Sequence, residues 1–142
     1  MGSCYNSIVV DVPREKVWET IKDFHDLSWA DPVITKLEIV GDKTGSQIGA
    51  QRLLNDAFLE RLVSVDEEGF TFTYSIDDGP EPLGKDAGLN YLGTVRLLPV
   101  TDSDATFVEW TSSFQSDSDQ AVSDFCNPVY VALLGALKSH LA

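Results

Sequence analysis

The feature that constrains the fold most is an amphipathic segment over residues 118–142. The rest of the chain from Val33 onward is typical of strands joined by turns, so one side of a sheet is the only partner for an apolar helix face. Apolar residues recur in the segment at the three-and-four spacing of one α-helix face: Val122, Phe125, Val129, Ala132, Leu133, Ala136 and Leu137. The other face carries polar residues: Asp119, Ser123, Asp124, Asn127 and Lys138. We therefore expect a sheet that curves around this helix, with Pro128 kinking or interrupting it near Asn127.

Seven segments of alternating apolar residues, bounded by turn residues, are predicted as strands. They are Cys4–Val12, Val33–Val40, Gln47–Leu54, Ala57–Asp66, Phe70–Asp77, Leu89–Pro99 and Ala105–Gln115. The short turns between them favour antiparallel neighbours. Between the first two strands, Pro13 is well placed to begin a helix that ends near Phe24, and a short helical turn follows before Pro32. The sequence thus predicts an α+β fold in one domain over residues 1–142: a seven-stranded antiparallel curved sheet wrapped around a long C-terminal helix, with two short helices between the first two strands.

Charge and composition limit the possible partners. The net charge of −13 disfavours binding to nucleic acid or to anionic membranes, because Lys and Arg are scattered along the chain. No apolar run approaches the roughly 18 residues that a membrane span needs. The two cysteines, Cys4 and Cys126, have no metal-ligand spacing and indicate a reducing cytoplasm. We expect no metal or other cofactor, and the sequence leaves open whether the protein is a monomer or a homodimer.

Seven short motifs, in this order and spacing, carry a resemblance to a known superfamily. They are Val12-Pro13 with Lys16-Val17-Trp18 and then Phe24, Leu27 and Trp29, Gly49-Ala50-Gln51-Arg52, Glu60-Arg61-Leu62, Tyr74-Ser75-Ile76, Asn90-Tyr91, Thr106-Phe107-Val108-Glu109-Trp110 and Leu137-Lys138. Together they resemble the START-like (SRPBCC) superfamily, in particular its polyketide cyclase/dehydrase branch, over essentially the whole chain. The resemblance implies a helix-grip fold with an apolar cavity between the sheet and the long helix. Carriers, hormone receptors, cyclases and co-chaperones share this fold, so the resemblance alone does not fix the function.

The resemblance extends to plant hormone receptors, whose pocket polar groups stand at the positions of Glu60 and Tyr91. Those receptors carry a long gate between the third and fourth strands. This chain has only Asn55-Asp56 there, which argues against a hormone-receptor function. The loop over Asp78–Gly88 is instead long, with three glycines and two prolines, and we predict that it is mobile and acts as a lid.

Glu60 is the most informative polar residue. Alternation alone does not decide the inner face of its strand. The two candidate faces are Phe58, Glu60, Leu62 and Ser64, or Leu59, Arg61, Val63 and Val65. The resemblance places Glu60 inward. In an apolar cavity its pKa would rise, which suits proton transfer or a hydrogen bond to a ligand. Glu60→Gln would then stabilise the fold slightly at pH 7. The alternatives are a structural pair with a neighbour or a side chain in water.

Tyr74 and Tyr91 are expected to face inward, where their hydroxyls would orient a ligand or serve as satisfied core groups. Trp29 follows the first helix, near the expected mouth of the cavity. The remaining predicted ligand-binding residues are apolar wall residues, for which plain core packing is the alternative: Phe72, Ile76, Trp110, Phe114, Phe125, Val129 and Leu133.

Three functions fit these observations. The first is binding of a small hydrophobic molecule, such as a lipid, polyketide or aromatic metabolite, in the cavity. The second is a cyclase or dehydratase in which Glu60 and a pocket tyrosine, with Tyr91 the candidate, transfer protons. The third is an interaction module with a filled core. An open cavity of several hundred Å³ would support the first two functions, and a filled core would support the third.

Overall fold

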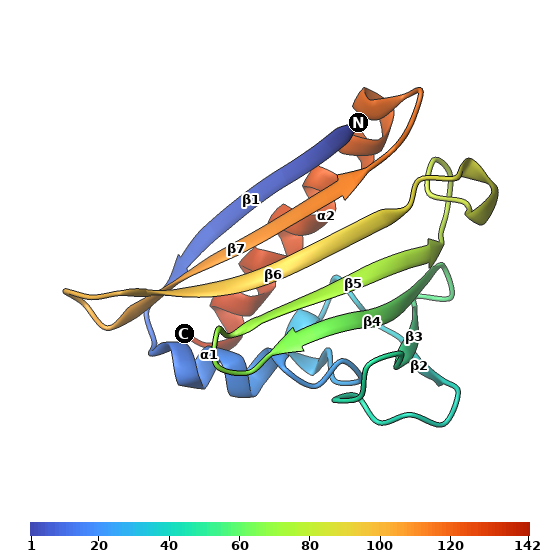
Figure 1. The fold of residues 1–142 in the computed structure, drawn as a ribbon. Coiled ribbons are helices and arrows are strands. Elements are labelled where there is room, and N and C mark those ends of the chain that lie inside the picture. The colour runs from blue at the N-terminus through green and yellow to red at the C-terminus, as the bar shows by residue number, and fades with distance from the viewer.

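The computed structural model describes residues 1–142 and confirms the predicted helix-grip architecture (Figure 1). Two short 3-10 turns, η1 (Ser28–Ala30) and η2 (Lys85–Ala87), lie between the main elements. The main elements are β1 (Gly2–Val10), α1 (Arg14–Ile21), β2 (Leu37–Val40), β3 (Gln51–Leu54), β4 (Phe58–Asp66), β5 (Thr71–Asp78), β6 (Tyr91–Val100), β7 (Ala105–Phe114) and α2 (Asp119–His140). Neither α1 nor α2 has the combination of length and apolar character that crossing a bilayer requires.

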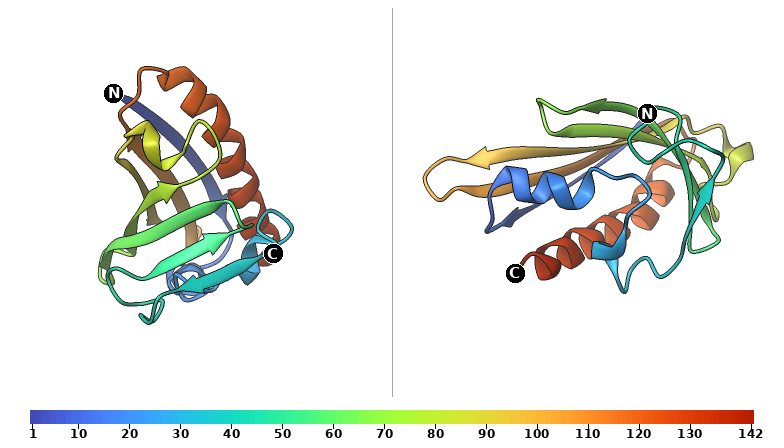
Figure 2. Two further views of the ribbon diagram at one scale, coloured as in Figure 1. Left: turned by 90° about the vertical axis from the view of Figure 1, so that its right-hand side faces the viewer. Right: turned by 90° about the horizontal axis from the view of Figure 1, so that it is seen from below.

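The sheet has the order β1-β7-β6-β5-β4-β3-β2, and every neighbouring pair is antiparallel. Strands β2 to β7 follow one another as a meander, and β1 joins the sheet beside β7. The sheet curves, and its concave side holds α2 and α1, as the view from below shows (Figure 2). Phe72, Tyr74 and Trp110 share one buried cluster against which Val129 packs, as the alternation in β5 and β7 predicts.

Helix α2 presents a slightly different face to the sheet from the predicted one. Its buried residues are Val122, Cys126, Tyr130, Leu133, Leu134 and Leu137. Phe125 and Val129 are half-buried, and Ala132 is exposed. The rotation follows from contacts with β1, where Ser123 Oγ donates to the Ser3 carbonyl and Asn6 Nδ2 donates to Asn127 Oδ1. Polar residues on this flank therefore meet a strand rather than water.

Pro128 does not interrupt α2, which continues from Asp119 to His140. The hydrogen bond that a proline cannot donate would have gone to the carbonyl of Asp124, four residues earlier. Pro128 and Asp124 are both exposed. The unpaired carbonyl therefore lies on the side of the helix that water reaches, and the helix tolerates it.

Strand β2 begins at Leu37 rather than at Val33. The segment before it is held by the side chain of Asn55. Asn55 Oδ1 accepts from the backbone N–H of Thr35 at 2.9 Å, and Asn55 Nδ2 donates to the Val33 carbonyl at 3.0 Å. These groups are therefore bound to a side chain instead of a neighbouring strand.

Other boundaries also differ from the prediction, including those of β3 and α1. Strand β3 begins at Gln51 rather than at Gln47, because Gly49 has a φ of 92°, which is left-handed backbone and not strand. Helix α1 ends at Ile21 rather than near Phe24. The backbone N–H of Phe24 donates to the carbonyl of Gly45 and is thus bound to a loop.

Candidate functional site

A cavity lies between the sheet and α2 and is lined by hydrophobic side chains apart from Arg52 and Glu60. Its volume is about 40 Å³, well below the roughly 300–1,000 Å³ of typical ligand pockets. In this conformation the interior is therefore nearly filled. The lining residues are Leu27, Ile34, Arg52, Leu54, Phe58, Glu60, Tyr74, Ile76, Leu83, Trp110, Phe125, Cys126, Val129, Tyr130 and Leu133.

Arg52 and Glu60 form a buried ion pair in the cavity wall. They stand directly opposite each other on β3 and β4, and they are 4% and 6% exposed. Arg52 Nε and Nη2 both donate to Glu60 Oε1, at 2.9 and 2.7 Å. The other carboxylate oxygen, Oε2, receives no hydrogen bond from the protein, so it is left as an acceptor at the cavity.

The turn between β3 and β4 sets this pairing. Asn55 and Asp56 have φ values of 53° and 55°, and the N–H of Ala57 donates to the Leu54 carbonyl, as in a type I′ turn. Ala57 adds one residue to the connection, and Leu54 pairs with Phe58. Because of this extra residue, Arg52 pairs with Glu60 rather than with Leu59.

A second set of contacts fixes the guanidinium of Arg52. Its Nη1 donates to the carbonyl of Phe24 at 3.0 Å, and its central carbon lies 3.8 Å from the centre of the Phe24 ring. The ring therefore adds a cation–π contact to the ion pair. The charge is held by β4 and by the segment after α1 at the same time.

Burial raises the pKa of the Glu60 carboxyl, and the neighbouring charge of Arg52 opposes this rise. The direction agrees with the prediction from the sequence, but the surroundings do not, because Glu60 is paired rather than alone in an apolar pocket. The prediction that Glu60→Gln stabilises the fold stays a prediction, because a raised pKa means that the fold favours the neutral side chain. Glu60→Leu is different, since it would leave Arg52 as a buried charge with neither a counterion nor a hydrogen-bond acceptor.

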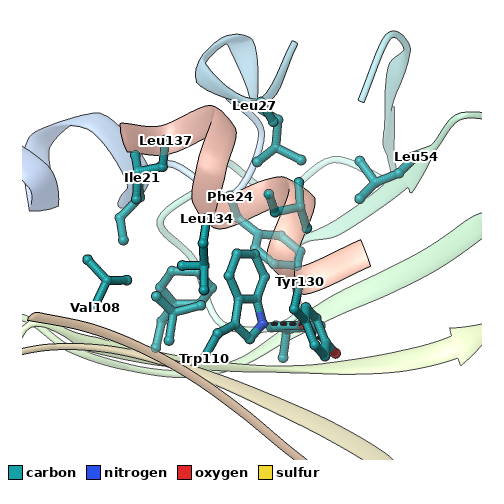
Figure 3. Close-up of a cluster of buried hydrophobic side chains, with 14 of the residues drawn as sticks. Ile21, Phe24, Leu27, Leu54, Val108, Trp110, Tyr130, Leu134 and Leu137 are labelled. Atoms are coloured by element: carbon teal, nitrogen blue, oxygen red, sulfur yellow. Dashed lines mark hydrogen bonds between the residues drawn. The ribbon is translucent and has the colours of Figure 1, made fainter. Parts of the chain in front are cut away.

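Three tyrosine hydroxyls form the second polar group of the interior. Trp110 Nε1 donates to the Tyr74 hydroxyl at 2.9 Å, and the Tyr74 and Tyr130 hydroxyls are 3.2 Å apart. The Tyr130 hydroxyl is in turn hydrogen-bonded to that of Tyr91. Figure 3 shows Trp110 and Tyr130 side by side beneath α2, with the Trp110 bond drawn as a dashed line. The chain of hydroxyls runs from β5 through α2 to β6.

These hydroxyls stay protonated at neutral pH. Burial raises the pKa values of Tyr74, Tyr91 and Tyr130 above the ordinary value of 10.0. Burial also raises the pKa of the Cys126 thiol to about 11. The thiol is therefore a poor nucleophile there, and the hydroxyl groups act as neutral hydrogen-bonding groups.

The predicted site residues fall into two groups. Those that line the cavity are Glu60, Tyr74, Ile76, Trp110, Phe125, Val129 and Leu133. Four others lie outside it. Tyr91 and Phe114 stack on each other with ring centres 5.6 Å apart, while Phe72 and Trp29 line a smaller inner cavity. Trp29 is only 4% exposed, so its predicted position near the mouth is wrong.

Sequence reasoning missed three residues of the cavity that matter most. Arg52 could have been found from the register of the β3–β4 hairpin. With three residues in the turn, Leu54 pairs with Phe58 and Arg52 therefore pairs with Glu60. Tyr130 lies four residues after Cys126 and eight after Val122, which is a helical spacing. Leu83 had no signal, because it stands in the long loop yet is 3% exposed and belongs to the core.

Comparison with known proteins supports the geometry. The profile of a family described as polyketide cyclase / dehydrase and lipid transport matches residues 1–142. A solved structure of a protein from Nitrosospira multiformis shares 44% sequence identity, covers 99% of this chain and 96% of its own, and superposes with a TM-score of 0.94. A search of curated proteins found no match.

More distant structures share the fold. The protein XoxI from Bacillus cereus is 25% identical, with coverage of 99% of this chain and 96% of its own and a TM-score of 0.80. Norcoclaurine synthase from Thalictrum flavum is 15% identical, with coverage of 96% and 84% and a TM-score of 0.74. At that identity the likeness concerns the fold alone.

Proposed function

Because the chain belongs to the polyketide cyclase/dehydrase and lipid-transport family, we propose that it binds a small hydrophobic molecule, such as a lipid, polyketide or aromatic metabolite, between the sheet and α2. One observation carries the proposal: the cavity wall is apolar except for a buried ion pair with a free carboxylate oxygen. A buried ion pair adds little net stability compared with apolar residues of similar volume. Its position beside a cavity therefore favours a role in recognition.

The site must open to admit a ligand, because its present volume is about 40 Å³. Phe125 and Val129 of α2 are half-buried, and Leu83 reaches the cavity from the loop that joins β5 and β6. We assign the opening to this loop, with Leu83 as the side chain that leaves. Faster hydrogen exchange over residues 79–90 than in β5 would support a lid, and equal protection would contradict it.

The chemistry of the ligand follows from the polar atoms at the cavity. Glu60 Oε2 accepts a hydrogen bond and does not donate one while the carboxyl is ionised. A ligand with a hydroxyl or amine would therefore bind more tightly than its hydrocarbon counterpart. Glu60 is hydrogen-bonded to Arg52 and the tyrosine hydroxyls are bonded to one another. This arrangement favours binding over proton transfer by a Glu60–tyrosine pair.

A filled-core interaction module is the second candidate, and the small cavity volume is the observation that favours it. Titration with the neutral fluorescent probe N-phenyl-1-naphthylamine distinguishes the two. Ligand binding predicts saturable fluorescence at one probe per chain. An interaction module predicts no saturable signal.

Two variants of α2 locate the bound probe. Val129→Trp fills the cavity and should abolish the signal. Val131→Trp is the matched control, since Val131 lies on the same helix but is 61% exposed, and it should bind as the wild type does. Equal binding by the two variants would place the probe on the surface and contradict the proposal. Native mass spectrometry of the purified wild-type protein would identify a bound natural ligand by its mass.

The cellular setting is also part of the proposal. Cys4 and Cys126 are both free and buried, which fits a reducing cytoplasm. Gel filtration with light scattering would decide between a monomer and a homodimer.

A further inference from the structure

A second cavity lies deeper in the interior, beyond Arg52. Its volume is about 10 Å³, room for at most one water molecule. It shares Leu27, Arg52 and Trp110 with the main cavity. These three side chains are therefore the wall between the two spaces, and a ligand that displaces them joins the cavities into one site.

One residue of the inner cavity, Trp29, carries a buried polar atom without a partner. Trp29 lines this cavity and is 4% exposed, and its Nε1 is enclosed with no hydrogen bond. The other two tryptophans differ. Trp18 Nε1 donates to Glu67 Oε2 at 2.9 Å, and Trp110 Nε1 donates to the Tyr74 hydroxyl at 2.9 Å. The unpaired indole N–H is thus particular to Trp29.

No side chain of the inner cavity can accept this hydrogen bond. Its lining is hydrophobic apart from Arg52, and both the indole N–H and the guanidinium are donors only. An acceptor must therefore come from a bound water molecule or from a ligand that displaces it. The charge of Arg52 is already balanced by Glu60, so an anionic acceptor would add an uncompensated buried charge, which is unfavourable. A neutral acceptor fits the site best.

We propose that the inner end of the site receives a neutral carbonyl group of the ligand, to which Trp29 Nε1 donates. This inference rests on the proposed ligand-binding function and narrows it to apolar carbonyl compounds. A hydroxyl elsewhere on the same molecule would reach Glu60 Oε2. Trp29 is then a specificity-determining residue that distinguishes a ketone from a hydrocarbon of the same shape.

Four compounds of similar size test the proposal. They are 4-hydroxyacetophenone, 4-methylacetophenone, 4-ethylphenol and 4-ethyltoluene, which carry both groups, the carbonyl, the hydroxyl or neither. Calorimetry on the wild-type protein should give each ketone an affinity about 5- to 10-fold higher than its ethyl counterpart, as expected for one hydrogen bond. In ¹H–¹⁵N spectra, the ketones should move the Trp29 indole N–H resonance downfield, while that of Trp18 stays in place.

Variants assign the effect to the indole N–H. Trp29→Phe should bind all four compounds but lose the preference for the carbonyl. The matched control Trp18→Phe removes an indole already bonded to Glu67 and should keep the preference. If Trp29→Phe does not fold, the shift of the Trp29 indole N–H resonance in the wild-type protein tests the proposal instead.

Two negative outcomes are distinguishable. Binding of all four compounds without a carbonyl preference, and with an unmoved Trp29 resonance, overturns this inference and leaves the proposed function standing. Failure of all four to bind, with the Trp110 indole resonance also unchanged, overturns the proposed function for this class of molecule and the inference with it.

Discussion

The interior holds two buried polar groups that differ in charge and in how the chain builds them. Arg52 and Glu60 are ionic partners eight residues apart on one hairpin. The hydroxyls of Tyr74, Tyr91 and Tyr130 are neutral, and the bonds between them join residues 56 and 39 positions apart. One group is made within a hairpin, while the other exists only when the sheet and α2 have packed.

This difference predicts unequal sensitivity to substitution. A charge in a low-dielectric interior requires a partner, and removal of that partner leaves an uncompensated charge. A neutral hydroxyl that loses a partner leaves only an unsatisfied dipole, which is less unfavourable. Measurements of the free energy of unfolding examine this comparison, from the largest expected effect to the smallest.

Breaking the ion pair should have the largest effect. Glu60→Leu should lower the free energy of unfolding by about 3–5 kcal/mol, because Arg52 remains buried with neither a counterion nor a hydrogen-bond acceptor. The double variant Arg52→Met/Glu60→Leu should recover most of this loss. Urea unfolding measures all three proteins.

An exposed ion pair serves as the control for that experiment. Arg61 Nε lies 3.6 Å from Asp77 Oδ2, and the Arg61 side chain is 51% exposed. Asp77→Asn should therefore change the free energy of unfolding by less than about 1 kcal/mol. If Glu60→Leu behaves like Asp77→Asn, the buried pair is not required for the fold, and the contrast with the tyrosines disappears.

Shortening the hydroxyl chain should have an intermediate effect. Tyr130→Phe removes the middle hydroxyl and should lower the free energy of unfolding by about 1–3 kcal/mol, because Tyr74 and Tyr91 both lose a partner. Tyr91→Phe removes an end and should lower it less. The control is Tyr5→Phe, which removes an exposed hydroxyl bonded to Glu109. Equal losses for Tyr130→Phe and Tyr5→Phe would show that the chain contributes no stability.

The smallest effect should appear in how the free energy of unfolding changes with pH. A carboxyl whose folded pKa is raised contributes stability below its unfolded pKa, which is about 4.5 for Glu60, and loses this contribution as the pH rises through the folded pKa. Relative to Arg52→Met/Glu60→Leu, the wild type should therefore become less stable as the pH rises from about 4.5 toward neutrality. A flat difference would mean that Arg52 cancels the effect of burial.

The tyrosines should also make the free energy of unfolding fall as the pH rises, but in a more alkaline pH range. Their folded pKa values are raised above 10.0, so stability is retained below pH 10 and falls above it as the unfolded chain ionises. Tyr130→Phe should show a shallower fall than the wild type, since one tyrosine fewer must remain protonated. A parallel fall in the two proteins would indicate that other groups control alkaline unfolding.

Local patterns in the sequence were sufficient for the fold but not for every strand face. The alternation of Phe72 and Tyr74 in β5 needs no tertiary information, and it predicted the inner face correctly. In β4 the alternation is ambiguous, because an irregularity between Leu62 and Ser64 shifts the register. As a result Leu62 faces the core, and Val65, three residues later, packs against it as well. A β-bulge of this kind has no reliable sequence signature.

The site was predicted less completely because two of its main features depend on small shifts. A turn one residue longer places Arg52 opposite Glu60. A small rotation of α2, set by its contacts with β1, turns Tyr130 inward and Ala132 outward. Neither shift changes the fold, but each decides which side chains meet in the cavity.

The pairing of β1 with β7 has a consequence for the order of folding. Gly2 lies opposite Phe114, so the first strand of this sheet to be synthesised pairs with the last strand of the sheet. At roughly 5–20 residues per second, translation leaves β1 without its neighbour for about 5–20 s. During this interval its two edges are unpaired, and such edges readily bind other strands. Aggregation of the nascent chain should therefore depend on how fast β7 emerges from the ribosome, rather than on the stability of the finished protein.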